Sequence, residues 1–138
     1  MTNTELQRKR MYRIVGAAMT LYNELGFGYA EAIYQECLAI VFDEMGIVWE
    51  SEALLSMYFH DHELVKKYRA DFVCYNDILV EIKAVSELLS EHRAQLFNYM
   101  RITQKHFGII INFGEEGYLH AERYQFNPST NKMMLVKG

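Results

Sequence analysis

The sequence predicts one α/β (α+β) domain over residues 1–138, in which helices flank a mixed β-sheet. Two observations predict this fold class. Long segments place apolar residues at spacings of three and four, which is the period of an amphipathic helix. Other segments are short, rich in aromatic and β-branched residues and bounded by turn-forming residues, which is typical of strands. Along the chain, the expected order is α-α-β-β-β-α-β-β.

The expected helices have recognisable ends. The first covers residues 4–25, and the second covers residues 30–45 and is followed by Gly46. Glycine is favoured at such a helix end because it adopts left-handed backbone conformations without a steric penalty. The third expected helix covers residues 87–102, with Ser86 as its N-cap.

The expected strands fall into two groups. In the first group, the turn-like runs His60-Asp61-His62 and Asn76-Asp77 separate three strands, which predicts antiparallel pairing in sequence order. In the second group, a fully apolar run predicts a buried strand and a more polar run predicts an edge strand. The five strands expected in this way are residues 47–59, 64–75, 78–85, 107–111 and 118–126.

Length and composition limit the class of protein. A chain of 138 residues with 51% hydrophobic and 23% charged residues is expected to fold around one core. No apolar run approaches the roughly 18 residues of a membrane-spanning helix, and the polar N-terminus does not resemble a signal peptide. Cys37 and Cys74 lie in apolar segments, which favours reduced thiols in a cytoplasmic protein with no membrane partner.

The charge distribution leaves nucleic-acid binding open. A net charge of −4 argues against a surface that attracts nucleic acid everywhere. A local basic groove is still permitted, because basic residues gather in two short runs. These are Arg8, Lys9, Arg10 and Arg13 near the start of the chain, and Lys66, Lys67 and Arg69 just before Asp71. Solvated surface is the alternative interpretation of both runs.

One strand carries charged residues where apolar ones are expected. In the run ILVEIKAV, Glu81 and Lys83 are two residues apart, so alternation along a strand points both side chains to one face. Burying such charges is costly unless they meet partners. Asp71 lies ten residues before Glu81 in the preceding strand, and a hairpin around Asn76-Asp77 would bring it next to them. The sequence therefore predicts two carboxylates and a lysine in one patch.

This trio has a definite chemical use. Two carboxylates and a backbone carbonyl, here that of Ile82, can bind a hard cation such as Mg²⁺. The cation polarises a phosphodiester and acidifies a bound water, and Lys83 can orient that water or stabilise transition-state charge. A Glu-x-Lys triplet alone is a weak signal. The alternative for these residues is a cross-strand salt bridge on an exposed sheet face.

Several segments along the chain are distinctive in combination. They are Gly28–Leu38, Tyr68–Phe72, Val80–Ala84, His92–Tyr99 and Gly108–Gly114. In this order they closely resemble the GxxExxY proteins, a bacterial and archaeal family placed in the PD-(D/E)xK nuclease superfamily. The resemblance covers about residues 8–125 and implies a restriction-endonuclease-like core.

The resemblance assigns expected roles to the charged residues. Asp71 matches the aspartate of the superfamily motif, with Ala70 in place of its least constrained residue, proline. Glu81 and Lys83 match the Glu-x-Lys half of the motif. Glu31 matches an acidic residue that reaches toward the metal site in related nucleases. The expected metal ligands are therefore Glu31, Asp71 and Glu81, although Glu31 could instead stabilise its helix dipole.

Three further residues are candidates on the same resemblance. Gln95 and Tyr99 look like the Gln-x-x-x-Tyr pattern that follows the lysine strand in nucleases resembling the RecB group. Their spacing places both on one helical face, where they could contact the site or a nucleic-acid strand. Gln95 is expected to assist Asp71 and Lys83 in catalysis. Tyr34 and Tyr99 are either active-site groups or core aromatics.

The function expected from these observations is Mg²⁺- or Mn²⁺-dependent hydrolysis of phosphodiester bonds in nucleic acid. DNA is favoured over RNA as the partner, and a homodimer is a further possibility, since small nuclease domains often need a second subunit to hold a duplex. The alternative is a non-catalytic regulatory domain that binds nucleic acid or protein and retains the nuclease fold, because fold alone does not establish activity.

Overall fold

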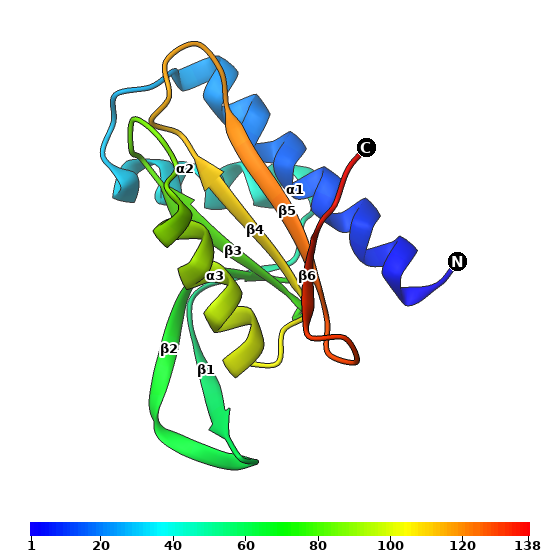
Figure 1. The fold of residues 1–138 in the computed structure, drawn as a ribbon. Helices are drawn as coiled ribbons and strands as arrows, with labels where there is room; N and C mark the ends of the chain where they lie inside the picture. Colours follow the sequence, from blue (N-terminus) through cyan, green and yellow to red (C-terminus); the bar gives the residue numbers. More distant parts are fainter.

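The computed structural model describes all residues 1–138, which form three helices and one six-stranded sheet (Figure 1). In chain order the elements are α1 (Asn3–Leu25), α2 (Glu31–Met45), β1 (Trp49–Phe59), β2 (His62–Cys74), β3 (Ile78–Lys83), α3 (Ser90–Ile102), β4 (Phe107–Asn112), β5 (His120–Asn127) and β6 (Lys132–Leu135). None of the helices combines the length and apolar character needed to cross a membrane.

The sheet is mixed, as predicted. Its strand order follows the sequence, β1-β2-β3-β4-β5-β6. β3 and β4 are parallel, with α3 as the crossover between them, and all other neighbours are antiparallel. Helices flank the sheet on both faces (Figure 1). The predicted α/β (α+β) class and the order of its elements are confirmed.

One strand was not predicted. β6 continues the expected order and pairs with β5, with Tyr124 opposite Leu135. The edge strand expected at residues 118–126 is therefore an interior strand, and β6 forms the edge of the sheet. β6 has only four residues, too few for an alternating pattern to be read.

Two helices cover one face of the sheet. α1 begins with a capping box in which the amide of Glu5 donates to Thr2 Oγ1 over 3.1 Å. α2 ends at Gly46, whose φ of 70° is in the left-handed region, as the sequence predicted. The apolar faces of both helices pack on the sheet residues Val80, Ile109 and others, each such side chain contributing about 1.5–3 kcal/mol through burial.

α3 covers the opposite face but starts later than predicted. It begins at Ser90 rather than near Glu87, and Ser86 is not its N-cap. The amide of Leu89 donates instead to His92 Nδ1 over 2.9 Å. Residues 84–89 stay out of the helix because Asn112 binds the backbone of Val85 through both its amide N–H and its carbonyl. This tertiary contact outweighs the local preference for a helix.

Alternation along β3 decides which face of the sheet carries the charged residues. Val80 and Ile82 belong to the core under α1 and α2, and Leu79 belongs to the core under α3. Glu81 and Lys83 therefore project to the α3 side.

β1 and β2 form a long hairpin that extends away from the body of the molecule (Figure 1). Its turn has positive φ at both His60 and Asp61, which matches the tight turn expected there.

Both cysteines, Cys37 and Cys74, are free thiols.

Candidate functional site

The predicted trio lies where β2 and β3 separate. The paired residues of the two strands end at Phe72 and Val80. Beyond that pair, the side chain of Asp71 accepts a hydrogen bond from the amide of Ile82 over 2.8 Å. The Asp71 carboxylate thus provides a hydrogen-bond partner for the Ile82 amide, which no longer pairs with the backbone of β2. Its other oxygen, Oδ1, has no hydrogen bond within the protein.

Glu81 is held by an aromatic pair. Its Oε1 accepts a hydrogen bond from the hydroxyl of Tyr68 on β2. The ring of Tyr68 stacks on that of Tyr99 on α3, with centroids 3.6 Å apart. Tyr99 was a predicted candidate, and its place is behind Tyr68 rather than against the carboxylates. Tyr68 was not singled out, although it lies only three residues before Asp71.

The carboxylates of the site share one electrostatic environment. Burial raises the pKa of Glu81 to about 7, with Glu31 and Glu52 adding to the rise and Lys83 opposing it. Burial also raises the pKa of Asp71, against the hydrogen bond from Ile82 and the charge of Lys83. A raised pKa marks carboxylates whose negative charges lack full compensation, which is typical of functional sites.

Glu31 faces the trio from the first turn of α2. Partial burial raises its pKa, the charge of Asp71 adds to the rise, and Lys83 lowers it. Glu31, Asp71, Glu81 and Lys83 are thus near enough for their charges to act on one another.

Two residues of this cluster were not predicted. Glu52 lies between the pairs Ser51–Phe72 and Ala53–Ala70, opposite Asp71, and its φ is 54°. Gln35 on α2 donates from Nε2 to Glu52 Oε1 and to the backbone carbonyl of Asp71, both over 3.2 Å. Gln35 is one helical turn after Glu31, a spacing that could have indicated it.

Two predicted residues lie elsewhere. Gln95 is exposed and lines a surface pocket that also includes Met57 and Tyr99. It has no hydrogen bond to the trio. Tyr34 is fully buried, stacks on Phe113 with centroids 4.5 Å apart, and donates from its hydroxyl to the carbonyl of Gly26 over 2.5 Å. Its contacts are those of a core aromatic that also anchors the loop before α2.

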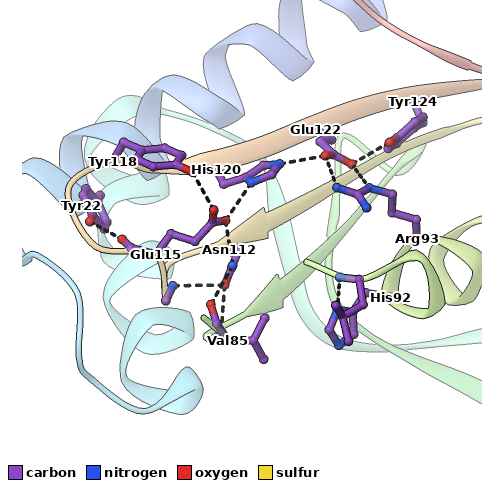
Figure 2. A network of polar contacts seen from close by, with 12 residues as sticks. Tyr22, Val85, His92, Arg93, Asn112, Glu115, Tyr118, His120, Glu122 and Tyr124 are labelled. Carbon is purple, nitrogen blue, oxygen red and sulfur yellow. Dashed lines mark hydrogen bonds and ion pairs between the residues drawn. The ribbon is translucent and has the colours of Figure 1, made fainter. Parts of the chain in front are cut away.

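A buried asparagine fixes the chain directly after Lys83 (Figure 2). The side chain of Asn112 accepts from the Val85 amide over 3.0 Å and donates to the Val85 carbonyl over 2.8 Å. It also donates to Glu115 Oε2 over 3.0 Å. Asn112 is paired with Lys83 across the parallel ladder. The polar groups of this fully buried amide are therefore used to hold the end of the lysine strand.

A second polar cluster ties α3 to β5 (Figure 2). Arg93 forms a bidentate pair with Glu122, with distances of 2.6 and 2.7 Å. The ring nitrogens of His120 lie 2.7 Å from Glu115 and 2.8 Å from Glu122. Glu122 is in the same cross-strand row as Ile110 and Glu81, so this cluster adjoins the candidate site from the β5 side.

The ion pair makes stability depend on pH in a definite direction. The hydrogen bond from Arg93 lowers the pKa of Glu122 to about 2, below its ordinary value of 4.5. The contribution of the Arg93–Glu122 ion pair to the free energy of unfolding is therefore complete above the ordinary pKa of Glu122. It is lost as the pH falls toward 2. We expect Glu122→Gln to reduce the free energy of unfolding by about 1–2 kcal/mol at neutral pH, since solvent screens part of the interaction. Urea unfolding from pH 7 to pH 3 should show this difference shrinking.

The matched control is Glu116→Gln, at an exposed carboxylate of the loop after β4. Its free energy of unfolding should stay within about 0.5 kcal/mol of the wild type at every pH. A Glu122→Gln difference that is constant with pH would contradict the assignment to the ion pair.

The donors at the trio fit a hard divalent cation in their chemistry. Asp71 keeps one carboxylate oxygen, Oδ1, without a protein hydrogen bond, and the carboxylate of Glu81 accepts from the Tyr68 hydroxyl and from the Asp71 backbone. Carboxylate and carbonyl oxygens are the ligands that Mg²⁺ and Mn²⁺ prefer. As arranged here, however, no three His, Cys, Asp or Glu side chains form a group close enough to hold a metal ion. A third ligand would need Glu31 or Glu52 to move inward, or a backbone carbonyl or water.

The fold, with acidic residues clustered around a lysine, is typical of a class of metal-dependent nucleases. The sequence profile of the PD-(D/E)XK nuclease superfamily matches residues 8–124. The chain belongs to the PD-(D/E)XK nuclease superfamily. No curated protein matches the sequence.

A solved structure is similar in fold. The crystal structure of SSO0001 is 20% identical in sequence with a TM-score of 0.53, and the match covers 72% of this chain and 53% of that chain. The chain thus spans about half the length of this relative. At this identity the likeness shows the fold alone.

Proposed function

We propose that the protein is a metal-dependent nuclease that hydrolyses phosphodiester bonds at Asp71, Glu81 and Lys83. The observation that carries the proposal is the separation of β2 and β3. There, two partly buried carboxylates with raised pKa values share one patch with a lysine. A superfamily of nucleases supplies the reaction class. Within that superfamily we propose the GxxExxY group, on the five segments whose order the chain reproduces.

Each residue has a separate proposed task. Asp71 and Glu81 would bind Mg²⁺ or Mn²⁺ with help from Glu31, and the bound cation would neutralise the phosphodiester and acidify a water. Lys83 would orient that water and stabilise the negative charge that develops on the phosphate. Gln95 is proposed to contact the nucleic acid from the exposed face of α3. Tyr68 would keep Glu81 in position through its hydroxyl.

The substrate proposed is nucleic acid, with DNA favoured over RNA, and the active species is proposed to be a homodimer. Light scattering coupled to size-exclusion chromatography tests the second point directly. A non-catalytic domain that binds nucleic acid or protein is the other candidate function. The observation favouring it is that no three ligand side chains stand close enough together to hold a metal ion.

Calorimetric titration with Mn²⁺ separates these candidates. Wild type and Asp71→Ala are titrated, and both are then incubated with linear single-stranded and double-stranded DNA and with RNA. The nuclease proposal expects binding and cleavage by the wild type, and loss of both in Asp71→Ala. A wild type that neither binds Mn²⁺ nor cuts any of the three substrates would overturn it in favour of the non-catalytic domain.

We expect Tyr68→Phe to weaken Mn²⁺ binding by about 10-fold or more, because groups that orient metal ligands typically have effects of this size. The change removes the hydroxyl that donates to Glu81 and keeps the ring that stacks on Tyr99. Calorimetry measures the dissociation constant. Tyr99→Phe is the matched control, since it removes a hydroxyl without a protein partner and should leave Mn²⁺ affinity unchanged. Equal affinities for the two variants would contradict the role given to Tyr68.

A further inference from the structure

A cleft lined by cations lies beside α1, apart from the trio. It is formed by the exposed side of α1, by β5 and by the segment after β6, which runs beside α1 in Figure 1. Its volume is about 470 Å³. Its lining includes Arg8, Lys9, Tyr12, Arg13, Arg123 and Lys137 and has no acidic side chain. A pocket of this size is large enough for a nucleotide.

The register of the sheet separates the cleft from the candidate catalytic site. Arg123 is paired with Ile109, which packs in the core under α1 and α2. Glu81 is paired with Ile110, which packs in the core under α3. Residues directly opposite each other on neighbouring strands share a face. Arg123 and Glu81 therefore project from opposite faces of the sheet.

None of the cations of the cleft forms an ion pair with a carboxylate. Arg8 donates to Gln125 Oε1 over 3.1 Å, and Arg13 donates to the Met45 carbonyl over 2.5 Å and to the hydroxyl of Tyr75 over 3.4 Å. These partners are neutral, so they position the guanidinium groups without cancelling their charge. The ion pairs of the molecule are made by other basic residues, namely Lys67, Arg69, Arg93 and His120. In a chain of net charge −4, the cleft is a local concentration of positive charge.

An aromatic side chain lies among these cations. Tyr12 is 67% exposed, which leaves much of its ring in solvent. Basic residues that follow a phosphate backbone, combined with an aromatic face on which an unpaired base stacks, are typical of single-stranded nucleic-acid binding. Duplex DNA would use the cations alone, because its bases are already stacked on one another.

We propose that this cleft binds a segment of single-stranded nucleic acid, with phosphates against the cations and one base stacked on Tyr12. The choice of ligand rests on the proposed function, since a nuclease must hold its substrate strand. The cleft would anchor that strand on the face of the sheet opposite to the one that carries Glu81 and Lys83.

Fluorescence anisotropy with a labelled oligothymidylate in EDTA tests the proposal, because binding is then measured without cleavage. Lys9→Gln/Lys137→Gln should weaken binding about 10-fold and reduce the slope of log affinity against log salt by about 1.4. Lys105→Gln/Lys132→Gln removes the same charge at lysines outside the cleft and outside both basic runs, and should change affinity far less. Tyr12→Ala should weaken binding about fivefold or more, and Tyr12→Phe should not.

Several results would overturn the proposal. These are no binding by the wild type, equal weakening by the two lysine double variants, or no effect of Tyr12→Ala. Competition by thymidine triphosphate or tripolyphosphate as effective as that by unlabelled oligothymidylate would also overturn it, in favour of a small-anion site. A failure of the cleft proposal can be told apart from a failure of the proposed function. If the protein binds the oligonucleotide as expected but cuts nothing, the proposed nuclease function is wrong and the proposed binding cleft stands. If it cuts nucleic acid but the cleft variants bind normally, the proposed cleft is wrong and the nuclease function stands.

Discussion

Lys83→Ala is expected to lower the rate of nucleic-acid cleavage by about 10²–10³ while leaving Mn²⁺ binding intact. Removing one group that stabilises transition-state charge typically costs this much. Lys83 is close enough to Glu31, Asp71 and Glu81 that its charge opposes the rise of each of their pKa values. Its loss removes a cation that competes with the metal for these carboxylates, so affinity for Mn²⁺ should be no weaker. Single-turnover cleavage and calorimetry measure the two quantities.

This prediction separates the lysine from the carboxylates. Asp71→Ala should lose metal and cleavage together, whereas Lys83→Ala should lose cleavage alone. Lys132→Ala, at an exposed lysine of β6, is the matched control and should cut at the wild-type rate. If Lys83→Ala cuts as fast as Lys132→Ala, Lys83 has no catalytic role and its place beside the carboxylates is that of an ion-pair partner.

The placement of the trio could be predicted because it depends on short-range geometry. Alternation along a strand puts Glu81 and Lys83 on one face whatever surrounds them. A tight hairpin then brings Asp71 beside them, since β2 and β3 pair within a few residues of their turn. Few alternatives exist for such local arrangements. The resemblance added Glu31, whose position relative to the trio depends on how α2 packs.

The rest of the candidate site depends on contacts that no local pattern specifies. Tyr68 donates to Glu81 while its ring stacks on Tyr99 of α3, a contact between distant parts of the chain. Gln35 and Glu52 meet at Asp71 because α2 packs near β1. Their residue types are ordinary for an exposed helix or strand, so the sequence alone does not distinguish them from solvated surface.

Long-range contacts also account for the differences between the expected and the observed fold. The residues expected to begin the third helix stay out of it, next to Val85, which Asn112 at the end of β4 binds. That contact joins residues 27 apart in sequence. A helix start is predicted from neighbouring residues, so it is wrong where a distant side chain provides better hydrogen bonds. The contact between Asn112 and Val85 thus both delays the start of the helix and fixes the chain directly after Lys83.

Gly114→Ala is expected to reduce the free energy of unfolding by about 3 kcal/mol, at the upper end of the cost of overpacking. A Cβ atom on Gly114 would lie 2.4 Å from both the N and O atoms of Val85 and 2.6 Å from the carbonyl carbon of Ala84. These are backbone atoms, already fixed by Asn112, so they cannot rotate away as a side chain could. Urea unfolding measures the change.

Gly16→Ala is the matched control, because the same methyl group would meet nothing within 4 Å there. Gly16 lies within α1, where alanine should stabilise the protein by about 0.4–1 kcal/mol. The two variants therefore differ in sign as well as size. Since the strained segment directly follows Lys83, Gly114→Ala should also lower cleavage under conditions where it remains folded, and Gly16→Ala should not. A folded Gly114→Ala protein of wild-type stability would show that residues 84–85 move freely, and the rigid placement of Lys83 argued above would then be wrong.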